Sequence, residues 1–303
     1  MAHEAEAGVT PARVLHRKRW PPDLTTPGLL GLPLGWLAVF FVVPIVIVGA
    51  YGFGVASLNP GPHSFTLTGW HDFLHSSVYL GLFWKSVKMS LLVSASVVFL
   101  AYPLAYYLAL SGTKLKYVLL LLLIAPFLTS YLLRVLAWKV ILGDQGVFNT
   151  FLFWTGLRDP DHPLSQLLYS RFAVLLVLGY IWLPFVALPI FVSLESLDRR
   201  LLEAASDLGA SRWQAFRRVT LPLSAPGIAA AFLFVFIPTI GEFVTPQLVG
   251  GSKGYLFGSA IADDFGQNSD WQSGAVLALF LMLVVLLLTG ATSRFLRATG
   301  GGS

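Results

Sequence analysis

The sequence predicts an all-α polytopic membrane protein with six transmembrane helices. Of its 303 residues, 56% are hydrophobic and only 12% are charged, whereas soluble domains carry about 25% charged residues. Six apolar runs each reach the roughly 20 residues that a membrane-spanning helix needs. Because the backbone in lipid must satisfy its own hydrogen bonds, each run is predicted to be helical.

The six runs divide the chain into two tails and one membrane domain. We expect a cytoplasmic N-terminal tail over 1–28, a six-helix domain over 29–297 and a C-terminal tail over 298–303 that resembles an added linker. The first run is too long for the core of a signal peptide, so it is interpreted as a retained anchor. The runs cover 30–56, 82–110, 117–142, 172–196, 226–249 and 273–296.

The distribution of basic residues predicts the orientation in the membrane. Thirteen of the twenty basic residues lie in the N-terminal tail, in the second and fourth connections and at the end of the last run. By the positive-inside rule, both termini and the segment 198–227 face the cytoplasm. The pI near 9.5 therefore reflects topology, and no nucleic-acid partner is expected. The thirteen residues are Arg13, Arg17, Lys18, Arg19, Lys114, Lys116, Arg199, Arg200, Arg212, Arg217, Arg218, Arg294 and Arg297.

The sequence lacks the common motifs of enzymes and metal sites. It has no cysteine, which excludes disulfides and thiolate ligands, and no G-x-x-x-x-G-K-[ST] loop for ATP hydrolysis. His71 and His75 are spaced to share one helical face as metal ligands. They lie in a polar segment without a clear third ligand, so a solvated pair is the favoured interpretation. We expect no catalytic residue, no metal site and no cofactor bound by this chain.

The segment 198–227 is predicted to form two short helices joined by an elbow. Asp198 precedes a run with helical spacing of apolar residues, and Gly209 is suited to the positive φ that ends a helix. Ser211 followed by Gln214 is a capping-box pattern that begins a second helix. We expect Pro222 to stop that helix, and Ala204 and Ala205 to lie at the bend.

This elbow resembles the cytoplasmic "EAA" loop of the permease subunits of binding-protein-dependent ABC importers. The resemblance implies a type I ABC importer permease fold in a bacterial inner membrane, with the loop docking onto a separate ATPase dimer that uses ATP and Mg²⁺. It also implies a second homologous permease, an extracytoplasmic solute-binding protein and membrane lipids as partners. The matching residues are Glu203, Ala204, Ala205, Gly209, Ala210, Phe216, Leu221, Pro222, Pro226, Gly227 and Ile228.

Two further stretches, residues 125–149 and 236–276, carry a more specific resemblance. The matching residues are Pro126, Arg134, Gly146, Asn149, Pro238, Gly241, Phe243, Gly250, Gly251, Gly258, Ile261, Phe265, Asp270 and Trp271. At these positions the chain is similar to spermidine/putrescine permeases within that family, which implies a polyamine as the transported solute. Because solute preference drifts among such permeases, another small solute stays open as an alternative.

Glu242 is the main candidate for the translocation pathway. We expect it inside the fifth span, where ionisable side chains face a cavity or a partner helix. It either attracts a polyamine cation or is a structural carboxylate bonded to a neighbouring subunit. Pro238 and Pro246 flank it and are expected to loosen the helix.

Aromatic and acidic residues elsewhere are further pathway candidates. Trp138, Tyr180 and Trp182 offer aromatic faces for a cation, although lipid-facing aromatics are commoner. Glu195, at the cytoplasmic end of the fourth span, is expected to close an inner gate or to pair with an arginine. An ion-coupled secondary transporter is the rival function, and it would need inverted repeats of broken helices that the sequence does not display.

Overall fold

The computed structural model describes residues 25–58, 64–112, 114–157, 159 and 162–300. The predicted N-terminal tail therefore lies largely outside the described residues. The chain separates into two units, Met1–Ile47 and Val48–Ser303. Helix α1 (Thr25–Gly52) begins in the first unit, contains Pro33 and Pro44, and exposes most of its large apolar side chains between Leu30 and Ile47.

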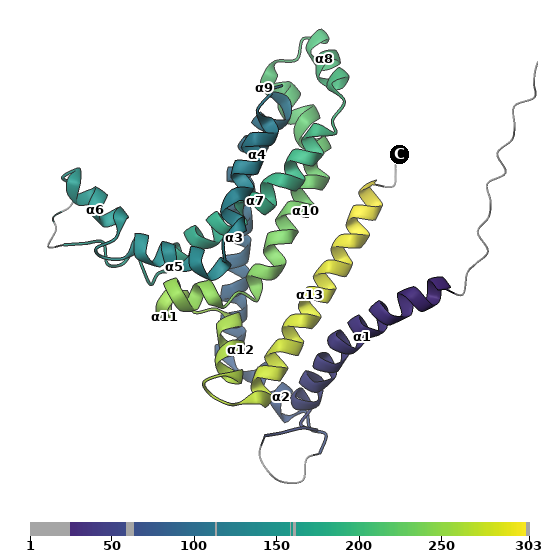
Figure 1. Cartoon of the computed structure of the whole chain (residues 1–303), viewed down its shortest axis with the longest axis vertical. Coiled ribbons are helices and arrows are strands. Elements are labelled where there is room, and N and C mark those ends of the chain that lie inside the picture. Colours follow the sequence, from purple (N-terminus) through teal and green to yellow (C-terminus); the bar gives the residue numbers. More distant parts are fainter. Residues whose placement is uncertain (1–24, 59–63, 113, 158, 160–161, 301–303) are drawn as a thin grey trace, which may run out of the picture. The chain divides into compact units, whose positions relative to one another are not determined.

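Three long helices form the centre of the second unit. Helices α3 (Ser77–Leu110), α7 (Arg171–Glu195) and α10 (Leu221–Ile240) pack on one another more extensively than any other elements. Figure 1 shows them side by side. Their contact is made by small and β-branched side chains, among them Val97, Ala101 and Val177, which are fully buried. Small residues allow the close backbone approach on which helix packing in membranes depends.

The third predicted span is a broken helix and not a continuous one. Helix α4 (Lys116–Ile124) ends in a 3₁₀ turn, η1 (Ala125–Leu128), and α5 (Tyr131–Leu142) then leaves at an angle of 89°. The prediction of one helix over 117–142 was wrong because Pro126 cannot continue the hydrogen-bond ladder. The hydroxyl of Thr129 donates to the carbonyl of Pro126 at 2.7 Å. Helix α6 (Val147–Trp154) follows.

Five described helices are long and apolar enough to cross a membrane, and the bent pair makes a sixth when it is counted as one span. The membrane-spanning all-α class predicted from the sequence is thus confirmed, with changed boundaries. Helix α10 ends at Ile240, so the fifth run does not stay helical to 249. The chain continues through a π-helical turn, η3 (Pro246–Gly250), and helices α11 (Gly251–Gly254), α12 (Phe257–Phe265) and α13 (Trp271–Gly300).

Helix α12 and the short helix α2 (Thr68–His75) lie at one end of the bundle, opposite α8 (Arg199–Asp207) (Figure 1). A separate aromatic cluster fills this end, with Phe73, Phe83 and Phe257 packed around Phe280. The backbone N–H of Phe257 donates to the Ser86 hydroxyl at 2.8 Å, which ties α12 to α3.

Gly258 holds α12 against the break after α10, and its replacement provides a test of this packing. A β-carbon at Gly258 would lie 2.7 Å from the Glu242 carbonyl oxygen and closer still to that of Gly241. Because backbone cannot yield as a flexible side chain does, we expect Gly258→Ala to destabilise the protein by about 1–3 kcal/mol. The measurement is the apparent unfolding temperature in nanodiscs.

The matched control is Gly81→Ala in α3, because no atom lies within 4 Å of a β-carbon built there. It should leave the unfolding temperature unchanged or raise it, as alanine is the better helix former. Equal temperatures for Gly258→Ala and the unmodified protein would contradict the packing described.

Candidate functional site

The elbow over 198–227 begins with the two caps that its sequence predicts. The Asp198 side chain accepts the backbone N–H of Arg200 at 3.0 Å at the start of α8. Gly209 has a φ of +79°, which closes that helix. The capping box is also present, because Ser211 and Gln214 exchange bonds of 3.3 and 2.8 Å at the start of α9 (Arg212–Ala215). These predictions are confirmed.

Two details of the predicted elbow were wrong. Pro222 does not stop the second helix, because α9 continues through a π-helical turn, η2 (Phe216–Thr220), directly into α10. The backbone N–H of Leu221 reaches the carbonyl of Phe216 across this widened turn, so the ladder is already altered where Pro222 removes a donor. Ala204 and Ala205 lie within α8, and the bend lies after Leu208.

The elbow lies beyond the end of the bundle (Figure 1), and some of its large apolar side chains are exposed. Leu208 is 89% exposed and Trp213 is 67% exposed. Glu203 and Ala204 are exposed as well, while Ala205 and Ala210 are half-buried. Large exposed apolar residues on a short capped element are typical of a docking surface.

The inner side of the elbow is fixed to the central helices. The Phe216 ring stacks on Trp213 at 5.3 Å and meets the rings of Tyr102 and Tyr106 in α3 at 5.9 and 5.7 Å. The Tyr102 hydroxyl lies 3.0 Å from that of Ser224 in α10.

The later motif residues belong to α10 and differ in their surroundings. Gly227 lets that helix approach α7, since a β-carbon would meet the Ser193 side chain. Leu221, Pro222 and Pro226 are exposed. The elbow therefore contacts α3 and is continuous with α10.

Glu195 lies at the same end of the bundle and forms an ion pair with Lys116 at the start of α4. Of the two roles expected for Glu195, an inner gate or a pair with an arginine, the arginine partner was wrong, because Lys116 comes from a helix whose direction the sequence does not reveal. Arg199 contacts the carbonyl of Ala109 at 3.5 Å instead. These contacts join the ends of α3, α4 and α7 near the elbow.

Glu242 lies in the break after α10 and not within a helical span. It is half-buried, and its side chain accepts the backbone N–H of Thr245 at 3.1 Å. The Thr245 hydroxyl lies 2.7 Å from that of Tyr131 in α5. The guanidinium of buried Arg134 lies over the Tyr131 ring at 5.9 Å. The carboxylate thus caps the first turn of the helical segment that begins at Val244 and continues into η3.

The acidic residues of α12 form a bonded group that sequence reasoning did not single out. The hydroxyl of Tyr255 donates to Asp263 at 2.7 Å, and Asn268 donates to Asp264 at 2.9 Å. Burial raises the pKa of Asp264, and the hydrogen bonds from Asn268 and Tyr79 oppose that rise. Burial and the bond to Asp263 raise the pKa of Tyr255. Only the adjacency of two aspartates in the sequence could have pointed to this group.

The aromatic candidates do not join Glu242 in a single site. Trp138 meets Tyr180 edge to face at 5.4 Å. Trp182 packs on Phe185 at 5.7 Å. Glu195 lies at the opposite end of the molecule from the break that contains Glu242. His75 bonds to the carbonyl of His71 at 2.8 Å, and the described residues contain no group of three side chains suited to a metal ion.

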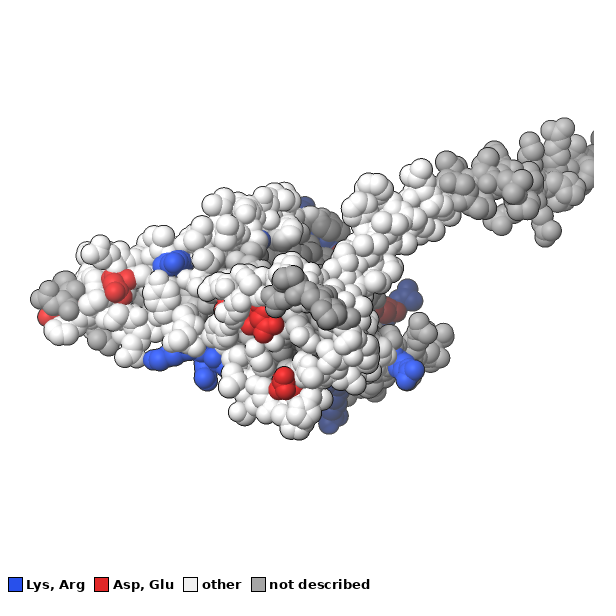
Figure 2. Space-filling model, turned by 90° about the horizontal axis from the view of Figure 1, so that it is seen from below, with Lys and Arg blue, Asp and Glu red and all other residues white. Residues whose placement is uncertain are grey.

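Charged groups are sparse on the face at the α12 end. Figure 2 shows isolated acidic and basic residues on a largely uncharged surface.

Sequence comparison identifies one family over most of the chain. Residues 101–296 match the model described as the binding-protein-dependent transport system inner membrane component. The spermidine/putrescine transport system permease protein PotB of Escherichia coli K12 is 37% identical over 267 residues, which cover 87% of this chain and 96% of that protein. PotB of Salmonella typhimurium LT2 is also 37% identical, with 87% and 92% covered.

Structure comparison finds the same architecture in two crystal structures of a bacterial alginate ABC transporter. One matches with a TM-score of 0.65 at 19% identity, covering 91% of this chain and 97% of the other. The second, in complex with an alginate pentasaccharide-bound periplasmic protein, matches with a TM-score of 0.67 at 17% identity, covering 91% and 95%. At these identities the likeness concerns the fold.

Proposed function

We propose that this chain, which belongs to the family of binding-protein-dependent transport system inner membrane components, is the permease subunit of an ATP-driven polyamine importer. It is a multi-pass inner-membrane protein, and the family predicted from the elbow is confirmed. The polyamine class is carried by one observation, the 37% identity to a spermidine/putrescine permease over 87% of the chain.

The elbow is the coupling element in this proposal. A cytoplasmic ATPase dimer would bind the exposed side of α8. ATP and Mg²⁺ would be used by that dimer and not by this chain. Closure of that dimer would push α8, and the Phe216 contacts and the continuous passage from α9 into α10 would carry the displacement to the central helices. Such rigid-body movement between two packed states is a common form of switching.

The remaining partners and the orientation follow from the same assignment. A second permease, homologous to this chain, would complete the pathway, and an extracytoplasmic solute-binding protein would deliver the solute at the α12 end. The elbow and both termini would face the cytoplasm, as the distribution of basic residues indicates. The carboxylates of Glu242, Asp263 and Asp264 would then lie at the entry end, where they favour a cation.

Coupling is tested by changing the backbone preference at Gly209. No atom lies within 4 Å of a β-carbon built there, so a side chain meets no clash and only the φ of +79° penalises it. Valine strongly disfavours this region, whereas asparagine tolerates it. We expect Gly209→Val to reduce ATP-driven uptake by the assembled transporter at least tenfold and Gly209→Asn to retain most of it. Equal uptake by both variants, at equal membrane levels, contradicts coupling through this elbow.

Dependence on partners is tested with the chain alone. Its sequence has no phosphate-binding loop, so in liposomes it should neither hydrolyse ATP nor concentrate solute, and both activities should return with the ATPase, the second permease and the binding protein. The measurements are phosphate release and radiolabelled spermidine uptake. Accumulation by the chain alone under a proton or sodium gradient would assign it to the secondary transporters.

The role of Glu242 is tested by removing its charge while keeping its oxygen. Glu242→Gln retains an acceptor for the Thr245 N–H, so the break should keep its cap. A polyamine carries several ammonium groups, and a carboxylate near the pathway lowers the barrier to its passage. We expect spermidine uptake to fall severalfold while ATP hydrolysis by the complex is largely preserved.

The matched control is Asp72→Asn, which removes one exposed carboxylate from α2 at the same end of the bundle. It should leave uptake unchanged. If uptake survives Glu242→Gln intact, the carboxylate is a structural cap and nothing more. If the unmodified complex transports neither spermidine nor putrescine, the polyamine assignment fails and another solute must be sought.

A further inference from the structure

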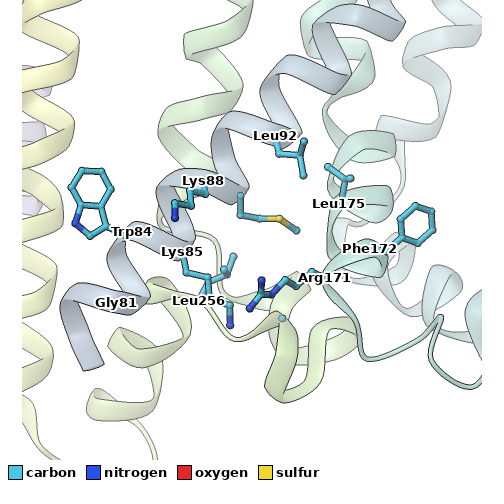
Figure 3. A pocket seen from close by; sticks show the side chains of 11 residues that line it. Gly81, Trp84, Lys85, Lys88, Leu92, Arg171, Phe172, Leu175 and Leu256 are labelled. Atoms are coloured by element: carbon cyan, nitrogen blue, oxygen red, sulfur yellow. The ribbon is translucent and has the colours of Figure 1, made fainter. Parts of the chain in front are cut away.

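A groove between α3 and α7 combines basic side chains with apolar walls. Its outer part is a cavity of about 740 Å³ with Lys85, Lys88 and Arg171 at its rim. Figure 3 shows Lys85 and Arg171 reaching toward one another, with Lys88 one turn further along α3. Leu92 and Leu175 line its inner part. Positive charges that face each other across an apolar wall repel one another, and an anion bound between them would remove that repulsion.

The groove continues along the two helices as an apolar channel. A second cavity of about 340 Å³ shares Phe172 and Leu175 with the first and extends to Leu100 on α3 and Leu183 on α7. Leu100 follows Lys85 by about 22 Å of helix at ~1.5 Å per residue. This length exceeds the roughly 15 Å that half of a ~30 Å hydrocarbon core occupies. We call the two cavities together the α3–α7 groove.

The basic rim lies where both helices enter the hydrocarbon. Residues 89–110 after Lys88 and residues 172–194 after Arg171 contain no charged side chain, and each stretch is long enough to span a membrane. The three cations are therefore at the level of the lipid phosphates, at the end of the bundle opposite α8. Basic groups close to the surface attract anionic lipids.

No protein group accounts for these charges among the residues that the structure describes. Neither lysine forms an ion pair there, and Arg171 donates only to the carbonyl of Lys253, at 3.1 Å. The apolar stretch 30–52 of the first span contains no acidic residue that could neutralise the rim. A polyamine would be repelled by it, so the groove is unsuited to the proposed solute.

We propose that the α3–α7 groove binds one anionic phospholipid. The phosphate lies among Lys85, Lys88 and Arg171, and an acyl chain follows the apolar channel toward Leu100 and Leu183. The order of polarity along the groove, charged at the membrane surface and apolar toward its middle, matches that of a lipid in the leaflet on the α12 side. Tyr180 lines the inner channel and on this proposal faces lipid and not solute.

The test measures lipids retained by the complete transporter. The complex is placed in nanodiscs of equal parts phosphatidylglycerol and phosphatidylcholine, and its bound lipids are counted by native mass spectrometry. One basic group contributes about fivefold to anionic-lipid binding. We expect the double variant Lys85→Gln, Lys88→Gln to retain one phosphatidylglycerol fewer than the unmodified transporter and to prefer this lipid about twentyfold less. The double variant Lys85→Arg, Lys88→Arg should keep the retained lipid and the preference. Lys139→Gln, which removes a cation of α5 outside the groove, is the matched control and should change neither.

A second measurement distinguishes the source of the phosphate. The acetylation rates of Lys85 and Lys88 should fall severalfold in phosphatidylglycerol nanodiscs relative to phosphatidylcholine nanodiscs. Equal protection by inorganic phosphate in phosphatidylcholine would assign the rim to a free anion and overturn the proposal. The two lysines could instead be protected from acetylation in phosphatidylcholine nanodiscs only when the second permease or the binding protein is present. That result would assign the basic rim to a protein carboxylate and would also overturn the proposal. An unchanged number of retained lipids in a well-folded Lys85→Gln, Lys88→Gln variant would overturn the proposal as well.

Discussion

The need to satisfy backbone hydrogen bonds away from water governs this structure. Continuous helices meet that need by themselves, so the described spans are helical over most of their length. Three of the interruptions each have a side chain that bonds to their backbone. Thr129 bonds to the carbonyl of Pro126 at the bend between α4 and α5, Glu242 accepts the N–H of Thr245 after α10, and Ser86 accepts that of Phe257 at the start of α12. The breaks are therefore built features, and the chemistry of the molecule concentrates beside them.

Features that depend on a few consecutive residues could be predicted from the sequence. The helix start at Asp198, the positive φ of Gly209 and the capping box at Ser211 each rest on contacts within four residues, and all three are present. The membrane class could be predicted for the same reason. A helix that crosses the bilayer needs an apolar run of a certain length, and such runs are visible in the sequence. The family could be recognised because the elbow motif is also local.

Features that depend on distant contacts could not be predicted. Glu242 looked like a charge within a span, whereas α10 ends at Ile240 and the backbone of Gly241 and Glu242 packs against Gly258 of α12. Lys116 as the partner of Glu195 required the direction of α4. Pro222 looked like a stop signal because proline usually is one, whereas the π-helical turn before it makes the missing donor tolerable. In each case the sequence pattern was present, but contacts with distant residues determined the structure that formed there.

The π-helical turn η2 also decides where the chain tolerates a change of length. A π turn holds one residue more than an α turn over about the same rotation of the helix. Deleting one residue from Phe216–Thr220 would therefore restore an ordinary helix and leave the direction of α8 nearly unchanged. The same deletion within α10, which is a regular α-helix, would rotate everything before it by about 100° about the axis of that helix. The side of α8 that now points outward would then face another direction. A loss of one residue between the elbow and the membrane is thus tolerated at η2 and not beyond it.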